Sequence, residues 1–361
     1  MNDKEAYKND VLANYEELEI ELMVLLLLTL QEYNQIEMYN RIEFRHLQYK
    51  VGRETYKEAL KIIRQKNSQN KKDLKQLYNE QAVGKEYNIE KERNKILKEH
   101  LKITDKNLNK LAIDMAKGVR KEITNMMGNV YKQVSTGQET FDMGFKNTAD
   151  DLYKKGITFT DKIGRNRSIE ATVRQDLLYR INNMNREIYK KAGYKMNSTG
   201  VQINISPNCR DTHQVINGKT FTNEEWKQYE YLTEEYNCQH VAKPIFIEFQ
   251  NNQYTQREID EANNRTVTYK GEKIPYYDAT QKQRALERAI RNAKKSVIAS
   301  KKTGIEEAKA NKQLLNAQAK MRSYIKGTKL TRDYDREYVA GYNRAVWQFD
   351  IIMILFWCKI L

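Results

Sequence analysis

The sequence has little proline, glycine, cysteine or histidine. It contains 3 Pro and 15 Gly among 361 residues, less than half of their average combined share of about 12%. This scarcity excludes collagen-like chains, proline-rich chains and Gly/Ser linkers, and it leaves few residues that would break a helix. The 3 Cys residues cannot build a disulfide framework for a chain of this length, which favours a reducing compartment.

Long apolar runs are also missing. The apolar stretches at 22–30 and 351–358 are much shorter than the roughly 20 residues that span a bilayer as a helix. We expect the first to be a buried core helix, and we expect neither a secretory leader nor a membrane span. For the hydrophobic tail at 344–361, two explanations stay open: it packs against the N-terminal helices or a partner chain, or it has no selected function.

Basic charge and apolar side chains are plentiful. There are 63 Lys and Arg against 48 Asp and Glu, which gives a net charge of +15 at pH 7 with neutral His. Hydrophobic residues form 40% of the chain and 24 residues are Tyr, enough to bury a core and to exclude wholesale disorder. A net basic surface would attract nucleic acid in a salt-dependent way.

Changes of composition along the chain predict a mainly α-helical protein with a small α+β module. Long N-terminal helices are expected first, with a helix–helix connection at the polar segment 66–72. Shorter helices separated by glycines follow, then a Cys/His-containing module with turns and strands, then a C-terminal helical pair and the tail. The predicted regions are 1–126, 127–196, 197–278, 279–343 and 344–361.

Local signals predict where several elements begin and end. Ser168 is a typical N-cap for an amphipathic helix that Gly193 would end. Residues 201–205 alternate between apolar and polar side chains, as a half-buried strand does, and residues 245–249 are a second candidate strand. Gly304 is expected to separate the two C-terminal helices.

Two short Cys/His clusters are the sharpest candidate site. Cys209 and His213 are four positions apart, and Cys238 and His240 are two apart. Two thiolates and two imidazoles are a complete tetrahedral ligand set for Zn²⁺, and a closed set of four would make the zinc structural. The spacing is not that of a standard zinc finger. The alternative is two buried cysteines, with Cys209 near Cys238, and two ordinary polar histidines.

A basic helix face is the second candidate site. Its cations recur every three or four residues, opposite the apolar stripe of the same helix. Such a face could follow the phosphates of a nucleic acid or contact a protein partner, whereas the alternative is a solvated face balanced by acids such as Glu287. No pattern for sequence-specific reading is present. The candidate residues are Arg284, Arg288, Arg291 and Lys295.

Enzyme motifs are absent from the sequence. It contains no G-x-x-x-x-G-K-[ST], G-x-G-x-x-G, G-x-S-x-G or H-E-x-x-H pattern. Cys209, Asp211 and His213 could be drawn as a nucleophile and base, but residues so close in sequence rarely converge in that way. We therefore expect no catalytic activity.

Short motifs follow one another in a distinctive order between about 130 and 345. They are Ser135-Thr136-Gly137-Gln138, Gly156-Ile157, Gly164-Arg165-Asn166-Arg167-Ser168-Ile169-Glu170, Val173-Arg174, Cys209-Arg210-Asp211-Thr212-His213, Asn217-Gly218-Lys219-Thr220-Phe221, Asn237-Cys238-Gln239-His240, Pro244, Tyr276-Tyr277-Asp278-Ala279-Thr280-Gln281, Arg284, Glu287-Arg288-Ala289-Ile290-Arg291 and Asp335-Arg336-Glu337-Tyr338-Val339-Ala340-Gly341. In this order they resemble the minor capsid proteins of tailed phages, the Mu F-like head-morphogenesis superfamily, and within it the minor capsid group of phages of Gram-positive hosts. Gln239 replaces the basic residue more usual in the family's Asn-Cys-x-His segment, and Cys209 differs from the family pattern in the first Cys/His cluster.

The resemblance implies a structural protein of the virion with no enzymatic activity of its own. It implies a place in the capsid interior near the portal, after assembly in the host cytoplasm, and partners among the portal protein and other head proteins. Support of head assembly and of DNA packaging or delivery would be its function. Two alternatives follow from the residues alone: a stand-alone, non-sequence-specific nucleic-acid-binding protein, and a zinc-dependent hydrolase that uses the Cys/His clusters.

Overall fold

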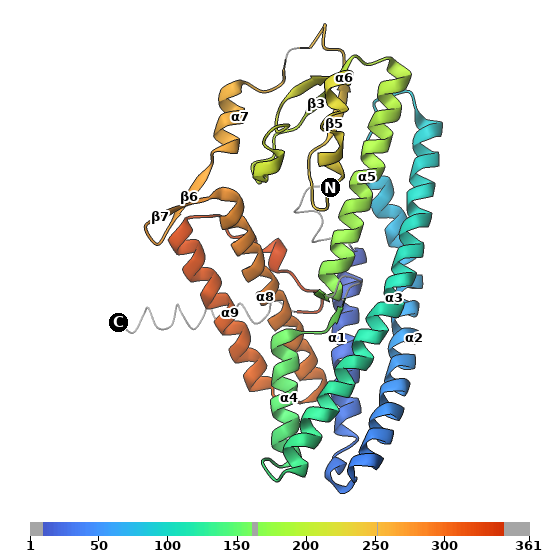
Figure 1. Ribbon diagram of the computed structural model, residues 1–361, viewed down its shortest axis with the longest axis vertical. Coiled ribbons are helices and arrows are strands. Elements are labelled where there is room, and N and C mark those ends of the chain that lie inside the picture. Colours follow the sequence, from blue (N-terminus) through green and yellow to red (C-terminus); the bar gives the residue numbers. More distant parts are fainter. Residues whose placement is uncertain (1–9, 161–164, 251, 343–361) are drawn as a thin grey trace.

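The computed structural model describes residues 10–160, 165–250 and 252–342. These residues form an elongated molecule in which long helices follow the main axis and a small sheet module lies at one end (Figure 1). The predicted fold class, mainly α with a small α+β module, is confirmed. The hydrophobic tail at 344–361 lies outside the described residues. Within the described ranges, no helix combines the length and apolar character that crossing a membrane requires.

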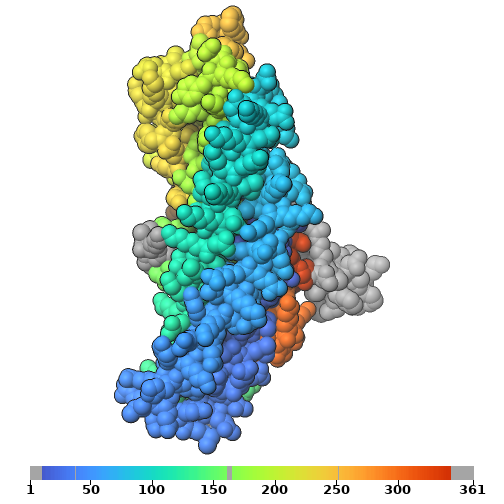
Figure 2. All heavy atoms as spheres, turned by 90° about the vertical axis from the view of Figure 1, so that its right-hand side faces the viewer, coloured from blue at the N-terminus to red at the C-terminus, as the bar shows by residue number. Residues whose placement is uncertain are grey.

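Three long helices make the N-terminal part: α1 (Asp10–Gln31), α2 (Arg41–Gln81) and α3 (Glu90–Ser135). Helix α1 buries an apolar stripe at three- and four-residue spacing that includes Tyr15 and Leu22. Helices α2 and α3 lie side by side along the molecule (Figures 1 and 2). The stretch at 22–30 is part of α1 and contributes to the main core, as expected.

The helix–helix connection predicted at 66–72 is wrong, because α2 continues through this segment. Its polar side chains form buried hydrogen bonds inside the bundle. The Asn67 Oδ1 accepts a bond of 2.5 Å from the Tyr15 hydroxyl, and its Nδ2 donates to the Leu108 carbonyl at 3.1 Å. Asn70 Oδ1 accepts from Asn14 Nδ2 at 2.6 Å. Buried polar groups with partners are compatible with a continuous helix.

Shorter elements follow, but the glycines do not separate them as regularly as expected. Gly128 and Gly144 lie inside α3 and α4, whereas Gly156 ends α4 at φ +67°. The predicted N-cap is confirmed, because Ser168 Oγ accepts from the Ala171 amide at 3.3 Å. Helix α5 passes Gly193 and ends before a left-handed Asn197. The bounds are α4 (Phe141–Lys155), hairpin β1 (Thr158–Thr160) and β2 (Asn166–Ser168), and α5 (Ile169–Met196).

The module contains a three-stranded antiparallel sheet in the order β4-β3-β5, with a small apolar core of its own around Ile203 and Trp226. The first predicted strand is present as β3, and the second begins earlier than expected and ends at Ile245. Its elements are β3 (Gly200–Ile203), η3 (Asp211–His213), β4 (Thr220–Thr222), α6 (Asn223–Trp226), η4 (Glu230–Glu234) and β5 (Ala242–Ile245).

The C-terminal part returns to the helical body. Gly304 adopts φ +72° and ends α8, and its backbone N–H donates a hydrogen bond to the Ser300 carbonyl. The predicted division into two helices is therefore confirmed. Helix α8 packs against both α9 and α1. The elements are α7 (Gln256–Asn263), hairpin β6 (Thr266–Tyr269) and β7 (Glu272–Pro275), α8 (Tyr276–Thr303), α9 (Glu307–Thr328) and η5 (Asp335–Glu337).

Helix α3 touches the β1 strand so closely at Gly118 that no larger side chain fits. A Cβ at Gly118 would lie 2.7 Å from the Phe159 Cβ and 3.0 Å from the Thr158 carbonyl oxygen. We expect Gly118→Ala to lower the free energy of unfolding by about 1–3 kcal/mol, because overpacking outweighs the helix preference of Ala. Urea unfolding measures this change. The matched control is Gly128→Ala, whose Cβ meets only the flexible Gln48 side chain at 3.3 Å; equal stability of the two variants would contradict the packing argument.

Candidate metal and anion site

Three of the four predicted metal ligands come together between η3 and β5. His213 ends η3, and Cys238 and His240 lie in the segment that leads into β5. The Nδ1 atoms of both imidazoles are 3.5 Å from the Cys238 Sγ. One ligand atom from each of the three residues lies within 4.8 Å of the others, and all three residues are buried. The two sequence clusters therefore converge, although 25 positions separate His213 from Cys238.

The outer nitrogen of each imidazole has its own partner. His213 Nε2 lies 3.1 Å from the Glu235 carboxylate, and His240 Nε2 lies 3.0 Å from the Asn217 Oδ1. Asn217 Oδ1 also accepts from the Ser206 amide, so it is an acceptor and we assign the proton of His240 to Nε2. With the same assignment for His213, both Nδ1 atoms present lone pairs towards Cys238. This is the arrangement in which a metal-binding histidine is held by its second nitrogen.

The distances suit zinc. Bonds of about 2.0 Å to nitrogen and 2.3 Å to sulfur at a tetrahedral angle place the two ligand atoms about 3.5 Å apart. Both Nδ1–Sγ distances are 3.5 Å. One thiolate and two imidazoles also match the ligand softness that zinc prefers. His213, Cys238 and His240 could therefore hold a metal ion.

Cys209 does not belong to this group of three. Its thiol donates to the Arg210 carbonyl at 3.3 Å. Burial, with further contributions from Cys238 and Asp211, raises the pKa of the Cys209 thiol to about 12. Among the described residues, the closed set of four ligands is therefore not assembled as expected, and three ligand atoms converge instead.

Protonation of the cluster would make metal binding there depend on pH. Burial, helped by the neighbouring His213, lowers the pKa of His240 to about 4. Burial also raises the pKa of the Cys238 thiol above its ordinary value. At neutral pH the imidazole of His240 is therefore ready to bind a metal, whereas the thiol must lose a proton to do so.

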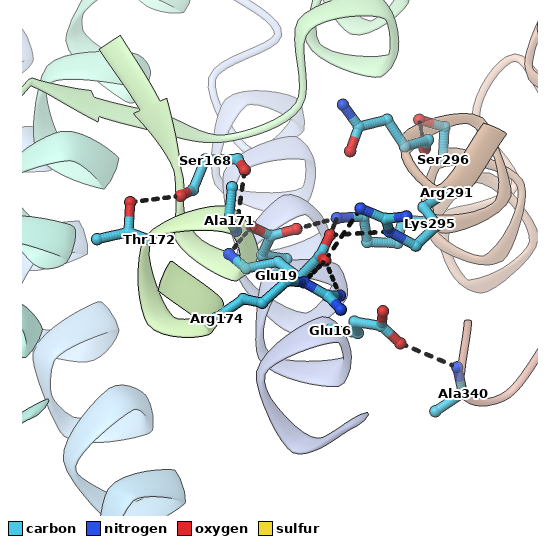
Figure 3. A network of polar contacts seen from close by, with 12 residues as sticks. Glu16, Glu19, Ser168, Ala171, Thr172, Arg174, Arg291, Lys295, Ser296 and Ala340 are labelled. Atoms are coloured by element: carbon cyan, nitrogen blue, oxygen red, sulfur yellow. Dashed lines mark hydrogen bonds and ion pairs between the residues drawn. The ribbon is translucent and has the colours of Figure 1, made fainter. Parts of the chain in front are cut away.

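The predicted basic face does not exist as one exposed surface. Arg291 and Lys295 are only 2% exposed and lie inside the helical body. Lys295 pairs with Glu19 from α1 and with Glu170 from α5, and Arg291 also pairs with Glu170. The expectation of one solvent-facing row is therefore wrong for Arg291 and Lys295, because acids from distant helices cover this part of α8. Figure 3 shows Lys295 extending from α8 towards Glu19 of α1.

The same buried network also includes residues that the sequence interpretation missed. Arg174 binds Glu170 one helical turn away, and Glu19 Oε1 accepts from the Glu170 amide at 2.7 Å. Glu19 thereby satisfies an amide in the first turn of α5, where helices lack internal partners. Glu16 Oε2 accepts from the Ala340 amide at 3.4 Å and so joins the C-terminal segment to α1 (Figure 3). Glu170 and Arg174 lie in the recognised motifs, but nothing local indicated burial.

The other two cations of the predicted face remain accessible. Arg284 is half-buried and Arg288 is exposed. They line a cavity of about 260 Å³ between α5, the module and α8, together with Arg174, Arg210 and Arg291. His213, Cys238 and His240 lie on the wall of the same cavity. The two sites predicted separately from the sequence are therefore adjacent in space.

The family model described as phage minor capsid protein 2 matches residues 28–326, and the chain belongs to this family. The resemblance to phage minor capsid proteins that the sequence motifs indicated is confirmed. Comparison with curated proteins and with solved structures found no match.

Membership in this family supports several coarse statements. The chain has a structural capsid role, its family places it in the virion, and other head proteins are its partners. A structural capsid family also points away from enzymatic activity.

Proposed function

We propose that this chain is a portal-associated minor subunit inside the head of a tailed phage. It would act through protein contacts and support head assembly and DNA packaging or delivery. The observation that carries the proposal is the family match over 28–326, which includes both the helical body and the module. The net charge of +15 makes the chain compatible with the neighbourhood of packaged DNA.

Large exposed apolar side chains in η2 (Ile36–Met38) and in the N-terminal part of α2 support docking to another head protein. The exposed fractions are 74% for Met38, 70% for Ile42 and 62% for Tyr49. Large apolar side chains gathered at the surface are typical of interaction sites. The connection between α1 and α2 lies at the end of the molecule away from the module (Figure 1).

Co-expression with the portal protein of the same phage tests the proposal. We expect the two chains to co-purify, and we expect mass spectrometry to detect this chain in purified virions. Ile42→Glu should weaken the complex at least tenfold, whereas Leu315→Glu, at an exposed apolar position of α9, should not. Absence of a complex together with absence from virions would overturn the proposal.

The alternative function is a stand-alone nucleic-acid-binding protein without sequence preference. The net charge of +15 favours it. It requires an affinity for duplex DNA that falls steeply between 50 and 200 mM salt, because binding releases counterions from the phosphates (roughly a thousandfold for six contacts). Anisotropy titrations at these two salt concentrations measure the effect, and a flat response would remove this alternative.

We also propose that His213, Cys238 and His240 bind one Zn²⁺, with water in the fourth position. Purified protein should then contain about one equivalent of zinc by mass spectrometry, and Cys238→Ser should lose it. Cys209→Ser should retain most of the metal, since Cys209 lies outside the convergent group. A folded wild-type protein with less than a tenth of an equivalent of zinc would exclude the site.

A further inference from the structure

Arginines from three separate parts of the chain surround one cavity. Arg174 comes from α5, Arg210 from the segment before η3, and Arg284, Arg288 and Arg291 come from α8. No Asp or Glu side chain lies on the wall of this cavity, which the described residues form. The remaining wall is mostly neutral polar side chains and the Cys/His cluster. A cavity with this lining concentrates positive potential and is built for an anion.

The surrounding ion pairs hold several of these guanidinium groups in place. Glu170 lies behind the wall and binds both Arg174 and Arg291. Glu235 binds Arg210 Nη1 at 2.6 Å, outside the cavity. Arg210 also donates to the Tyr236 carbonyl. Donors that are already fixed lose little conformational entropy when a ligand binds, so the acids orient the site rather than fill it.

We propose that this cavity binds a phosphate group, carried either by the end of a nucleic-acid strand or by a free nucleotide or phosphate ion. Guanidinium forks bind phosphate oxygens through paired hydrogen bonds, and a phosphate monoester carries up to two charges. A carboxylate from an acidic protein segment offers fewer oxygens and a single charge to the same five arginines. The phosphate is therefore the anion that fits this lining best.

The volume of the cavity and the Asn208 Oδ1 atom limit further which phosphate compounds could bind. A volume of about 260 Å³ is slightly below the roughly 300–1,000 Å³ of ordinary ligand pockets, so a strand end or one nucleotide fits and a duplex does not. Asn208, on the wall, has a buried Oδ1 without a hydrogen-bond partner among the described residues. A sugar hydroxyl next to the phosphate would supply the missing donor.

Binding measurements on the purified full chain in phosphate- and sulfate-free buffer test this inference. The probes are inorganic phosphate by calorimetry, and a single-stranded oligonucleotide with a 5′-phosphate or a 5′-hydroxyl by anisotropy. We expect the 5′-phosphate to increase affinity at least tenfold, and Arg284→Gln and Arg288→Gln each to remove most of that gain. Arg257→Gln, which removes one exposed charge on α7, is the matched control and should change nothing.

The outcomes distinguish a phosphate at a strand end from free inorganic phosphate, and both of these from an acidic peptide. Displacement of the 5′-phosphorylated strand by inorganic phosphate would support the shared site, and a strand that phosphate cannot displace would place the binding elsewhere. Equal affinity for the two strand ends, equal loss in the Arg257→Gln control, or tighter binding of an acidic peptide would overturn the proposal. Melting temperatures of Arg288→Gln, an exposed position, verify folding. The result does not depend on portal binding.

Discussion

Replacing Glu170 by Gln should destabilise the protein more than any other single substitution considered for this chain. Glu170 is 2% exposed, and its carboxylate has three cationic partners. Arg174 Nε lies 3.1 Å from its Oε1, Arg291 Nε lies 3.2 Å from its Oε2, and Lys295 Nζ lies 3.6 Å from its Oε2. Removing the charge leaves buried cations without their shared counter-ion, and we expect a loss of about 3–5 kcal/mol in the free energy of unfolding.

The pH dependence gives this expectation a second readout. Although burial opposes it, the charges of Arg291, Arg174 and Lys295 hold the pKa of the Glu170 carboxyl well below its usual range. The stabilisation is therefore present above the unfolded pKa, near 4.5, and is lost only as the pH falls towards the lower folded pKa. Urea unfolding of wild type and Glu170→Gln at pH 7.5 measures the main effect. The control is Glu261→Gln, an exposed partner of Arg257, and an equal change in both variants would contradict the buried-network argument.

Replacing Glu16 by Gln should have the opposite sign and should depend strongly on pH. Burial, helped by the negative charge of Glu170, raises the pKa of Glu16 from 4.5 to about 7, against the opposing charges of Lys295, Arg291 and Arg174. Because the folded state holds this proton more tightly than the unfolded state, ionised Glu16 reduces stability as the pH rises from about 4.5 to 7. The neutral Gln side chain avoids that loss of stability. Its oxygen can still accept the hydrogen bond from the Ala340 backbone N–H.

The expected size follows from the shift itself. At about 1.36 kcal/mol per pKa unit, a rise from 4.5 to about 7 corresponds to about 3 kcal/mol. Glu16→Gln should therefore be more stable than wild type by up to this amount at pH 8.5, and the difference should shrink towards zero at pH 4.5. A difference that is the same at both pH values would show that Glu16 is already ionised in the folded protein.

Local signals in the sequence predicted the parts of the fold that local physics controls. The Ser168 hydroxyl satisfies an amide of α5, and Gly304 takes the left-handed conformation that ends α8; both depend only on near neighbours in the chain. The prediction of a helix–helix connection at the polar segment 66–72 was wrong because it, too, rested only on near neighbours in the chain. The amides of this segment have partners on α1 and α3, and those helices supply what the local sequence lacks.

The candidate site was predictable only in its chemistry. The residue types of His213, Cys238 and His240 indicated a metal site, and the structure brings their ligand atoms together. The sequence could not show whether Cys209 is the fourth ligand. Its separation of four positions from His213 does not determine the direction of the Cys209 thiol. Metal binding itself stays a prediction.

The basic helix face shows where sequence reasoning reaches its limit. Helical periodicity placed four cations on one side of α8 correctly, since spacing alone sets the angle between side chains on a helix. What faces that side depends on the packing of α1 and α5, whose acids lie more than 100 positions away from Arg291 and Lys295. The sequence thus determined the helical class, several helix ends, the metal-ligand chemistry and the excess of basic charge. Only the tertiary structure decided which of those charges pair with acids in the core and which remain accessible, because that depends on contacts between distant helices.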